Sequence, residues 1–313
     1  MPNQKDSQKV VLTEEMFHRV GVDEHSSENV VRPNISYWQD AWRRLKQNKV
    51  AIVSMSFLIF VALMCIFAPH IYPHAFDEQI IEHTNQGPTA SHIFGLDDLG
   101  RDIFARVWVG GRVSLAIGVI GAAISLAVGV LYGGISGYFG GAIDNVMMRI
   151  VEILVGIPYM IVVILMSIIL GKGMGSLLVA LCFTSWTGLA RLVRGQVINL
   201  MESEYILAAK ALGTPTYKII FRHLLPNTLS IIIVETTFSI PSFIFAESFL
   251  SFIGMGIQPP NTSWGAMAAL GQQQMSNYPH ELLFPALAIS LTMLAFNLLG
   301  DGLRDAFDPK LRQ

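Results

Sequence analysis

Charged residues are scarce in this sequence of 313 residues. Asp, Glu, Lys and Arg together make up 14% of the chain, well below the share of about 25% in soluble globular proteins, while hydrophobic residues make up 52%. The mean hydropathy is +0.50. This balance excludes an ordinary soluble domain and indicates an integral membrane protein that crosses the bilayer several times.

Cysteine is nearly absent, and its placement excludes two kinds of chemistry. Cys65 and Cys182 both lie inside apolar runs, so they indicate neither a disulfide framework nor a thiolate metal site, and small buried hydrophobic side chains are the simpler interpretation. His70 and His74 have the spacing of a helical metal pair, but Pro73 breaks the helix that would aim both rings at one ion. We therefore expect no metal and no cofactor bound by this chain.

Motifs for catalysis are also missing. Gly171 and Lys172 are similar to part of a phosphate-binding loop, but Met166 and Gly173 stand where that loop needs Gly and Ser or Thr. The sequence contains no arrangement typical of a nucleophile with its base, and no internal repeat. The N-terminus also lacks the apolar core and cleavage site of a secretory signal. We expect a non-catalytic membrane subunit whose N-terminus is retained.

Apolar runs instead dominate the chain and predict six transmembrane helices in an all-α protein. The second run has small side chains at regular spacing, which lets helices approach closely in lipid. The predicted spans cover residues 50–69, 113–139, 150–170, 176–190, 228–253 and 282–299. The small residues of the second span are Gly118, Gly121, Ala122, Ser125, Gly129 and Gly133.

The distribution of positive charge sets the predicted orientation. With both termini in the cytoplasm, the cytoplasmic segments hold 17 of the 21 Lys and Arg residues. Residues 1–49 then form a cytoplasmic tail whose last part, from Ser36, is an interfacial helix with Trp38 and Trp42 at the level of the lipid headgroups. Because this basic segment directly precedes a span, it indicates contact with lipid and not with nucleic acid.

The segments between the spans complete the predicted organisation. Residues 70–112 form an extracellular segment with a surface helix after Asp102, and residues 254–281 form a second external loop. Residues 113–305 are the core of five helices, with a cytoplasmic loop at about 195–227, and residues 306–313 are a cytoplasmic tail. Arg149 and Glu152 are three residues apart, so we expect an interfacial ion pair between them.

Three polar residues inside predicted spans are candidates for the substrate path. A charged carboxylate in the middle of the membrane costs about 3 kcal/mol, so Glu235 and Glu247 should face a pore, a partner or a water pocket. They are equally compatible with a structural role, in which they cap a kink at Pro241 or form hydrogen bonds to neighbouring helices. Asn297 in the last span is the third candidate.

The cytoplasmic loop contains a short, strongly helical segment at residues 204–213. Ala208, Ala209 and Lys210 favour a helix, Gly213 is a typical helix end, and Pro215 prevents the helix from resuming. Ten residues would make a rod of about 15 Å, too short to cross a bilayer but long enough for a partner protein to hold.

This loop resembles the signature of the membrane subunits of ABC importers. His223 stands where many such permeases have Ile, and the run RHLLPN is closer to the peptide and nickel branch. Residues 95–102 (GLDDLGRD) and 258–265 (QPPNTSWG) also resemble segments of peptide permeases, and the similarity extends from residue 36 to residue 312. The signature positions are Glu204, Ala208, Ala209, Gly213, Leu225 and Pro226.

The resemblance implies the shorter, C-type permease subunit of an oligopeptide or dipeptide importer, with the type I importer fold. It implies a second permease subunit, two cytoplasmic ATPases that bind ATP and Mg, an extracellular substrate-binding protein and a peptide substrate. This chain would lie in the plasma membrane of a prokaryote, and the 204–213 helix would couple it to a cytoplasmic ATPase. Nickel or glutathione importers share these motifs. An ion-driven secondary transporter that uses Glu235 and Glu247 is the alternative from another class, and a membrane-anchored scaffold is a third.

Overall fold

The computed structural model describes residues 36–308, and the rest of the expected N-terminal and C-terminal tails lies outside this range. Within it the secondary structure is helical, apart from one isolated bridge between Leu96 and Asp102. In chain order the elements are α1 (Tyr37–Gln47), α2 (Lys49–Ile71), the short 3-10 helix η2 (Ile81–His83), α3 (Ile103–Phe139), α4 (Gly141–Val155), α5 (Tyr159–Leu170), α6 (Met174–Met201), α7 (Glu204–Ala211), α8 (Thr216–Lys218), the π-helix η3 (Ile219–Leu224), α9 (Leu225–Phe252), α10 (Trp264–Gln274) and α11 (His280–Phe307).

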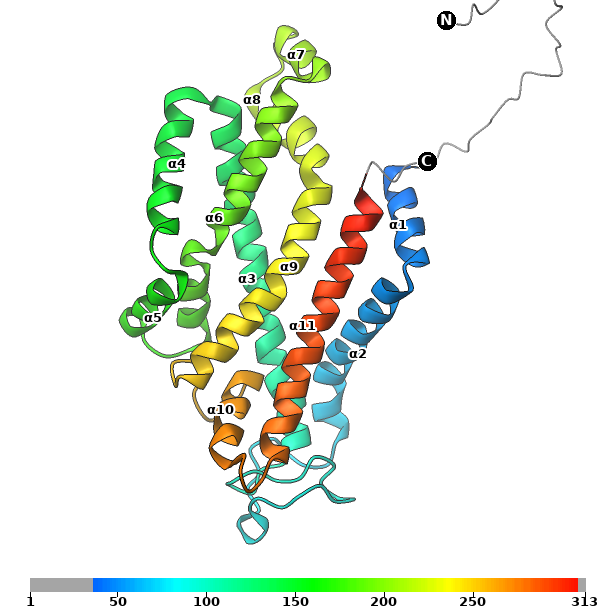
Figure 1. Ribbon diagram of the computed structural model, residues 1–313, viewed down its shortest axis with the longest axis vertical. Helices are drawn as coiled ribbons and strands as arrows, with labels where there is room; N and C mark the ends of the chain where they lie inside the picture. The colour runs from blue at the N-terminus through cyan, green and yellow to red at the C-terminus, as the bar shows by residue number, and fades with distance from the viewer. Residues whose placement is uncertain (1–35, 309–313) are drawn as a thin grey trace, which may run out of the picture.

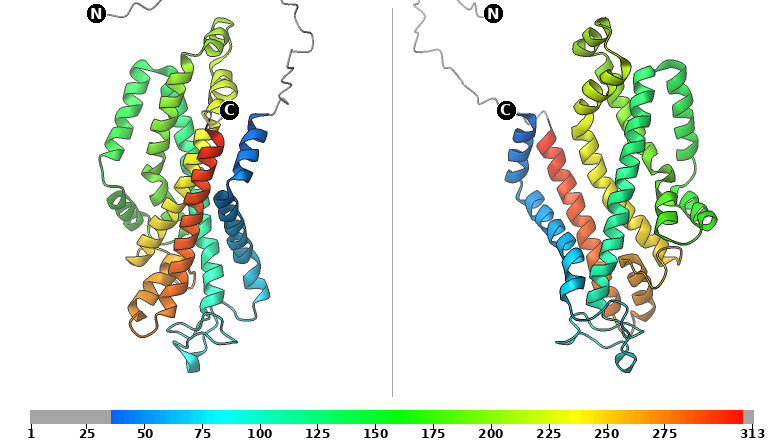
Figure 2. Two further views of the ribbon diagram at one scale, coloured as in Figure 1. Left: turned by 45° about the vertical axis from the view of Figure 1, so that its right-hand side comes forward. Right: turned by 180° about the vertical axis from the view of Figure 1, so that it is seen from behind.

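Five helical segments of the described chain are long and apolar enough to cross a membrane. They are α2, α3, α6, the continuous run from α8 through α9, and α11. These helices run along the long axis of the molecule (Figure 1), and two further views show the same arrangement (Figure 2). The helix α7 and the C-terminal end of α11 lie toward one end, and the loop between α2 and α3 lies at the other. The prediction of an all-helical membrane protein is confirmed.

The predicted third span, residues 150–170, is not one straight helix. α4 ends at Val155, and α5 continues at an angle of 84° after a short break that contains Pro158. Proline donates no backbone hydrogen bond and disfavours a helical residue before it, so the break falls where the sequence forces it. The described chain therefore has five candidate spans, or six if the bent pair counts as one.

The predicted surface helix after Asp102 is in fact the first part of α3. The Asp102 side chain caps this helix by accepting a hydrogen bond of 2.9 Å from the Ala105 backbone nitrogen. Ile103 and Val107 are almost fully buried against Trp264, so their apolar stripe faces the protein interior. The apolar pattern was correctly recognised, but a stripe of this kind packs equally well against a neighbouring helix or a lipid surface.

The loop predicted at residues 254–281 contains an additional helix, α10. Ser263 caps it by accepting a hydrogen bond from the Ala266 nitrogen, and the Trp264 indole nitrogen donates to the Val107 carbonyl oxygen at 2.8 Å. Trp264 is fully buried. The helix therefore packs as part of the bundle, between α9 and α11. α6 and α11 also continue past the C-terminal ends of their predicted spans. The prediction ended each span near the first charged residues, but the helices continue through Arg194 and Arg304.

The small residues of α3 allow close contacts, as predicted. A Cβ atom added at Gly118 or Gly121 would meet side chains of α9, and one added at Gly129 would meet α6. At Gly133 the added atom would lie 2.3 Å from the carbonyl oxygen of Ala190. The helix α3 thus packs against both α6 and α9 through a stripe of glycine.

The helix α1 is amphipathic, as predicted from the pattern after Ser36. Its residues Ala41 and Leu45 are buried, and Leu45 belongs to the apolar cluster at the end of α11, while Trp38 and Trp42 are about half exposed.

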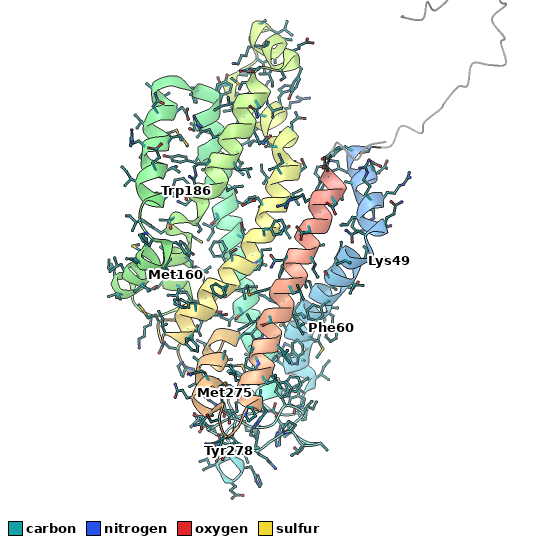
Figure 3. The ribbon with its side chains drawn as sticks, in the orientation of Figure 1. Lys49, Phe60, Met160, Trp186, Met275 and Tyr278 are labelled. Atoms are coloured by element: carbon teal, nitrogen blue, oxygen red, sulfur yellow. The ribbon has the colours of Figure 1, made fainter. Side chains whose placement is uncertain are left out.

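In Figure 3, Lys49 marks the start of α2, and Phe60, which is 53% exposed, lies further along this helix. Figure 3 also places Met275 and Tyr278 at the end of the molecule opposite α7. The location of α1 at a lipid surface remains a prediction.

Candidate functional site

The helix α7 projects from one end of the bundle (Figure 1) and covers most of the predicted 204–213 segment. It ends in a Schellman motif. The Gly213 nitrogen donates to the Lys210 carbonyl oxygen at 2.9 Å, and the Thr214 nitrogen donates to that of Ala209 at 3.0 Å. Gly213 has a φ of +72°, a conformation that other residues adopt only at a cost. The helix stop predicted at Gly213 is therefore confirmed.

A buried residue and a polar contact attach α7 to the bundle. Ile206 is fully buried and belongs to an apolar cluster that includes Val197 and Leu224. The Lys210 ammonium lies 5.5 Å from the centre of the Tyr138 ring at the end of α3, a cation–π contact. A motion of α7 would therefore be transmitted directly to α3, α6 and η3.

The outward side of α7 is open to a partner. Leu212 is 85% exposed and Leu207 is 53% exposed, so two large apolar side chains have no cover within the described chain. Glu204 and Ala208 are also exposed, and Ala209 is half-buried. An exposed apolar patch with a flat, alanine-lined helix beside it is typical of a protein contact surface.

The other two signature residues begin α9 and differ in burial. Leu225 is half-buried and packs against the cluster that holds Ile206, whereas Pro226 is exposed in the first turn. Proline has no backbone donor, and Pro226 stands where the continuous run passes from the π-helix η3 into α9. The structure therefore places all six signature residues at one end of the molecule, within α7, its C-terminal stop and the start of α9.

A partly buried ion pair near this end was not foreseen from the sequence. The Nε and Nη2 atoms of Arg194 donate to the two carboxylate oxygens of Asp144, both at 2.5 Å, and Ser136 donates to the same carboxylate. The pair joins α4 to α6. A charged residue in an apolar helix is expected to find a partner, but the sequence alone does not single out this pair, because α4 also contains Arg149 and Glu152 and α6 also contains Arg191. The predicted pair of Arg149 and Glu152 is also present, at 2.9 Å, and is exposed.

Of the three substrate-path candidates, Glu247 is fully buried. Its carboxylate accepts hydrogen bonds from Ser251 at 2.7 Å and from Ser114 at 3.2 Å. These contacts join α9 to α3, so the structure favours the structural alternative for this residue. Ser251 is 4 positions from Glu247, so helical spacing could have predicted this contact. Ser114 is 133 positions away, so its contact could not be predicted from the sequence.

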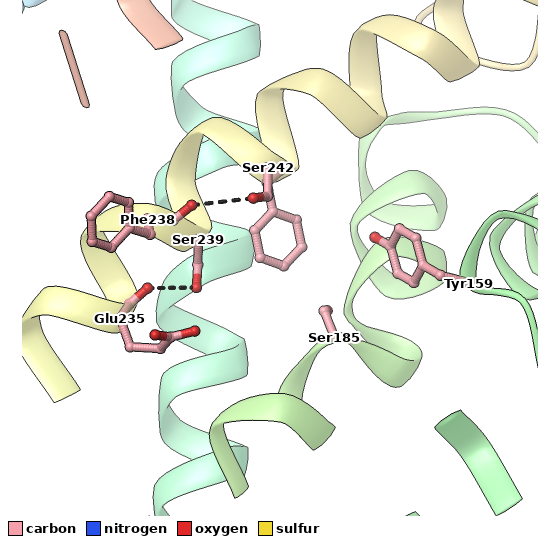
Figure 4. A pocket seen from close by; sticks show the side chains of 7 residues that line it. Tyr159, Ser185, Glu235, Phe238, Ser239 and Ser242 are labelled. Carbon is pink, nitrogen blue, oxygen red and sulfur yellow. Dashed lines mark hydrogen bonds between the residues drawn. The ribbon is translucent and has the colours of Figure 1, made fainter. Parts of the chain in front are cut away.

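The second candidate, Glu235, faces two cavities. The first, called the α5 cavity here, has a volume of about 310 Å³ and lies between α5, α6 and α9 (Figure 4). The second, the α11 cavity, has a volume of about 460 Å³ and reaches Arg304 on α11. The third candidate, Asn297, is exposed on α11. The α5 cavity is lined by Tyr159, Ser185, Glu235, Phe238, Ser239, Ser242 and Phe243.

The opposite end of the molecule is fastened by a polar network around Asp102. This carboxylate accepts a hydrogen bond from the Tyr72 hydroxyl at 2.9 Å and contacts the His92 ring nitrogen at 2.8 Å. Burial, reinforced by the hydrogen bond to Asp102, raises the pKa of Tyr72 to about 12. Arg101 and Asp97 form a second pair at 2.8 Å. These contacts hold the loop that contains residues 95–102.

Comparison with known families yields two matches. Residues 129–313 match the family described as "Binding-protein-dependent transport system inner membrane component". Residues 36–88 match the "N-terminal TM domain of oligopeptide transport permease C". The first match includes the exposed side of α7, the start of α9 and the residues that line both cavities.

Individual relatives are similar over nearly the whole chain. A dipeptide transport system permease protein of Bacillus subtilis (strain 168) is 50% identical over 288 residues, which cover 92% of this chain and 90% of the relative. An oligopeptide transport system permease protein of the same organism is 42% identical and covers 96% of this chain and 99% of the relative. A glutathione transport system permease protein of Pectobacterium atrosepticum is 39% identical and covers 88% of this chain and 92% of the relative.

Proposed function

This chain belongs to the family of binding-protein-dependent transport system inner membrane components, and from that membership we propose that it is the permease subunit of an ATP-driven importer of dipeptides or oligopeptides. The observation that carries the proposal is the 50% identity to a dipeptide permease over 92% of the chain. The match of residues 36–88 to the N-terminal domain of an oligopeptide permease supports the same substrate class.

We further propose six membrane crossings with both termini in the cytoplasm. The bent pair of α4 and α5 then counts as one crossing, which brings α7 and the C-terminal end of α11 to the same side. The concentration of Lys and Arg in the segments on this side supports the orientation. The bacterial relatives support a location in the inner membrane of a prokaryote.

The proposed partners follow from the surfaces that the bundle exposes. A cytoplasmic ATPase would hold α7 by its exposed residues Leu207 and Leu212, and Ile206 would pass the motion to the bundle. A second permease subunit would complete the translocation path, and an extracellular binding protein would deliver the peptide to the opposite end. ATP and Mg would be bound by the ATPases, and this chain would be non-catalytic.

The test is ATP-dependent uptake of a labelled dipeptide by the whole transporter in proteoliposomes. In Leu212→Asp a charge replaces an apolar side chain that is 85% exposed, so we expect the subunit to fold but to lose its ATPase on purification and at least tenfold of its uptake. Leu212→Met is the matched control, because it keeps an apolar side chain at the same exposed position. Equal uptake by both variants would contradict the coupling role, and uptake by the isolated chain without nucleotide would contradict the ATP-driven mechanism.

The glutathione relative defines a second candidate substrate within the same class. Glutathione is itself a short peptide, and the identity of 39% is lower than the 50% to the dipeptide permease. Competition between labelled dipeptide and unlabelled glutathione, in the same proteoliposomes, separates the two. Stronger inhibition by glutathione than by unlabelled dipeptide would reassign the substrate.

A further inference from the structure

Glu235 has no partner of its own in the described part of the chain, in contrast to Glu247. No hydrogen bond or ion pair is formed by its carboxylate, although it lies among side chains of α9 that line both the α5 cavity and the α11 cavity. Glu247, twelve residues later, is fully buried and satisfied by two serines. A carboxylate left open toward a cavity in a membrane protein is a functional feature by default, because its exposure within the bilayer costs free energy.

The hydroxyl groups of the α5 cavity each donate to a backbone carbonyl in this arrangement, so they present oxygen lone pairs to the cavity. Figure 4 shows two of these bonds on α9. The four bonds run from Ser239 to the Glu235 carbonyl at 2.9 Å, from Ser242 to that of Phe238 at 3.2 Å, and from Ser185 and Tyr159 to that of Leu181 at 2.7 Å and 3.3 Å.

The cavity therefore offers acceptors to a ligand. Its polar lining consists of one carboxylate and hydroxyl oxygens that retain lone pairs, and it contains no Lys or Arg. Its rings include Phe238, which already holds a cation: the guanidinium carbon of Arg304 lies 4.9 Å from the ring centre. A primary ammonium group has three donors and no acceptor, and it is attracted to aromatic rings, so it complements this lining.

We propose that Glu235, the neighbouring hydroxyl oxygens and the Phe238 ring bind a primary ammonium group in the α5 cavity. We assign the ligand as a peptide in transit that carries such a group, and this assignment rests on the proposed function. The ammonium can be the peptide's amino terminus or a lysine side chain, and both share this chemistry. Arg304 forms an ion pair with Asp301 at 3.9 Å, and within the described chain no ion pair joins it to Glu235.

The first experiment measures the electrostatic preference of the cavity without transport. Ser239→Cys in the complete transporter is modified with two methanethiosulfonates, one with a trimethylammonium group and one with a sulfonate. Cys65 and Cys182 are buried, and a sample without the new cysteine gives the background. We expect Glu235→Gln to lower the ratio of cationic to anionic modification rates about tenfold, as a full charge several ångströms from the thiol requires.

The controls separate charge from folding. Glu235→Asp keeps the charge and should keep most of the ratio. Glu152→Gln removes a carboxylate that is exposed on α4 and paired with Arg149, so it should leave the ratio unchanged. An unchanged ratio in Glu235→Gln would overturn the proposal. So would failure of both reagents to modify the thiol introduced by Ser239→Cys, since the cavity would then be closed to charged ligands.

The second experiment identifies the source of the ammonium from kcat/KM for uptake. A loss in Glu235→Gln of at least fivefold for both Lys-free and Lys-containing peptides assigns the amino terminus, and a loss confined to the Lys-containing peptides assigns the side chain. No loss for either would overturn the assignment of the peptide as ligand. If the unaltered transporter takes up no peptide at all, the proposed function fails, while the ratio of modification rates still tests the ammonium preference.

Discussion

At the scale of single residues, two pairs of identical residues show how the same residue type acquires different roles. Glu235 and Glu247 are twelve positions apart on one helix, yet the first faces cavities and the second is enclosed by serines. Gly213 and Gly133 are likewise both glycines required by geometry. Gly213 is required by a positive φ with open space around it, and Gly133 by the close approach of a neighbouring backbone.

Gly213→Val should uncouple the transporter without preventing its assembly. No atom lies within 4 Å of an added Cβ, so the cost is backbone strain at φ +72°, about 1–2 kcal/mol. Strain of this size shifts the population of the α7 stop by a factor of about 5–30. We expect ATP hydrolysis to persist while peptide uptake falls severalfold, measured together in proteoliposomes. Gly213→Asn is the control, because asparagine tolerates this conformation, and equal uptake by all three proteins would argue against a rigid stop.

At the scale of elements, the bundle depends on how closely α3 approaches α6. The contact is made by glycines that leave no room for a side chain, and it places α6, which leads into α7, directly against α3. Since lipid offers no hydrophobic drive for helix association, this contact must come from packing.

The substitutions Gly133→Ala and Gly134→Ala should therefore have different effects on the stability of the protein. The added methyl at Gly133 would lie 2.3 Å from a backbone oxygen of α6, whereas at Gly134 its nearest neighbour would be a side-chain atom at 3.7 Å. We expect Gly133→Ala to destabilise the protein by about 1–3 kcal/mol through overpacking. Gly134→Ala should be neutral or slightly stabilising, because alanine favours a helix. Thermal unfolding in detergent compares them, and equal midpoints would contradict the proposed contact.

At the scale of the whole molecule, the bent pair of α4 and α5 stands at the side of the bundle (Figure 1), and α4 is joined to α6 by the ion pair of Asp144 and Arg194. The Arg194 side chain is 33% exposed and that of Asp144 is 10% exposed. The attachment is thus partly screened by solvent, which weakens it relative to a fully buried pair.

Asp144→Ala should loosen this attachment and lower stability by about 1–2 kcal/mol, because a charged hydrogen-bonded group loses its partner. A double-mutant cycle with Arg194→Ala, followed by thermal unfolding in detergent, measures the coupling between the two side chains. We expect a coupling energy of about 1 kcal/mol or more. Strictly additive losses would mean that the ion pair does not hold α4 to the bundle.

The sequence by itself determined the class of protein, most of the spans, the α7 helix and its stop at Gly213. These features depend on apolar content, helical preference and one conformational requirement of glycine, all of which are local. It also determined the glycine stripe of α3, since close helix packing in lipid leaves a regular pattern of small residues.

Only the tertiary structure decided the features that depend on distant partners. It joined the predicted surface helix to α3, bent the third span, packed α10 into the bundle and paired Asp144 with Arg194, 50 positions away. It also separated Glu235 from Glu247. Both are carboxylates in apolar helices, and the difference arises because serines from α3 and α9 surround one while the other faces a cavity. The physical reason is that burial and hydrogen bonding are set by the neighbours of a side chain in space, which helical periodicity alone does not specify.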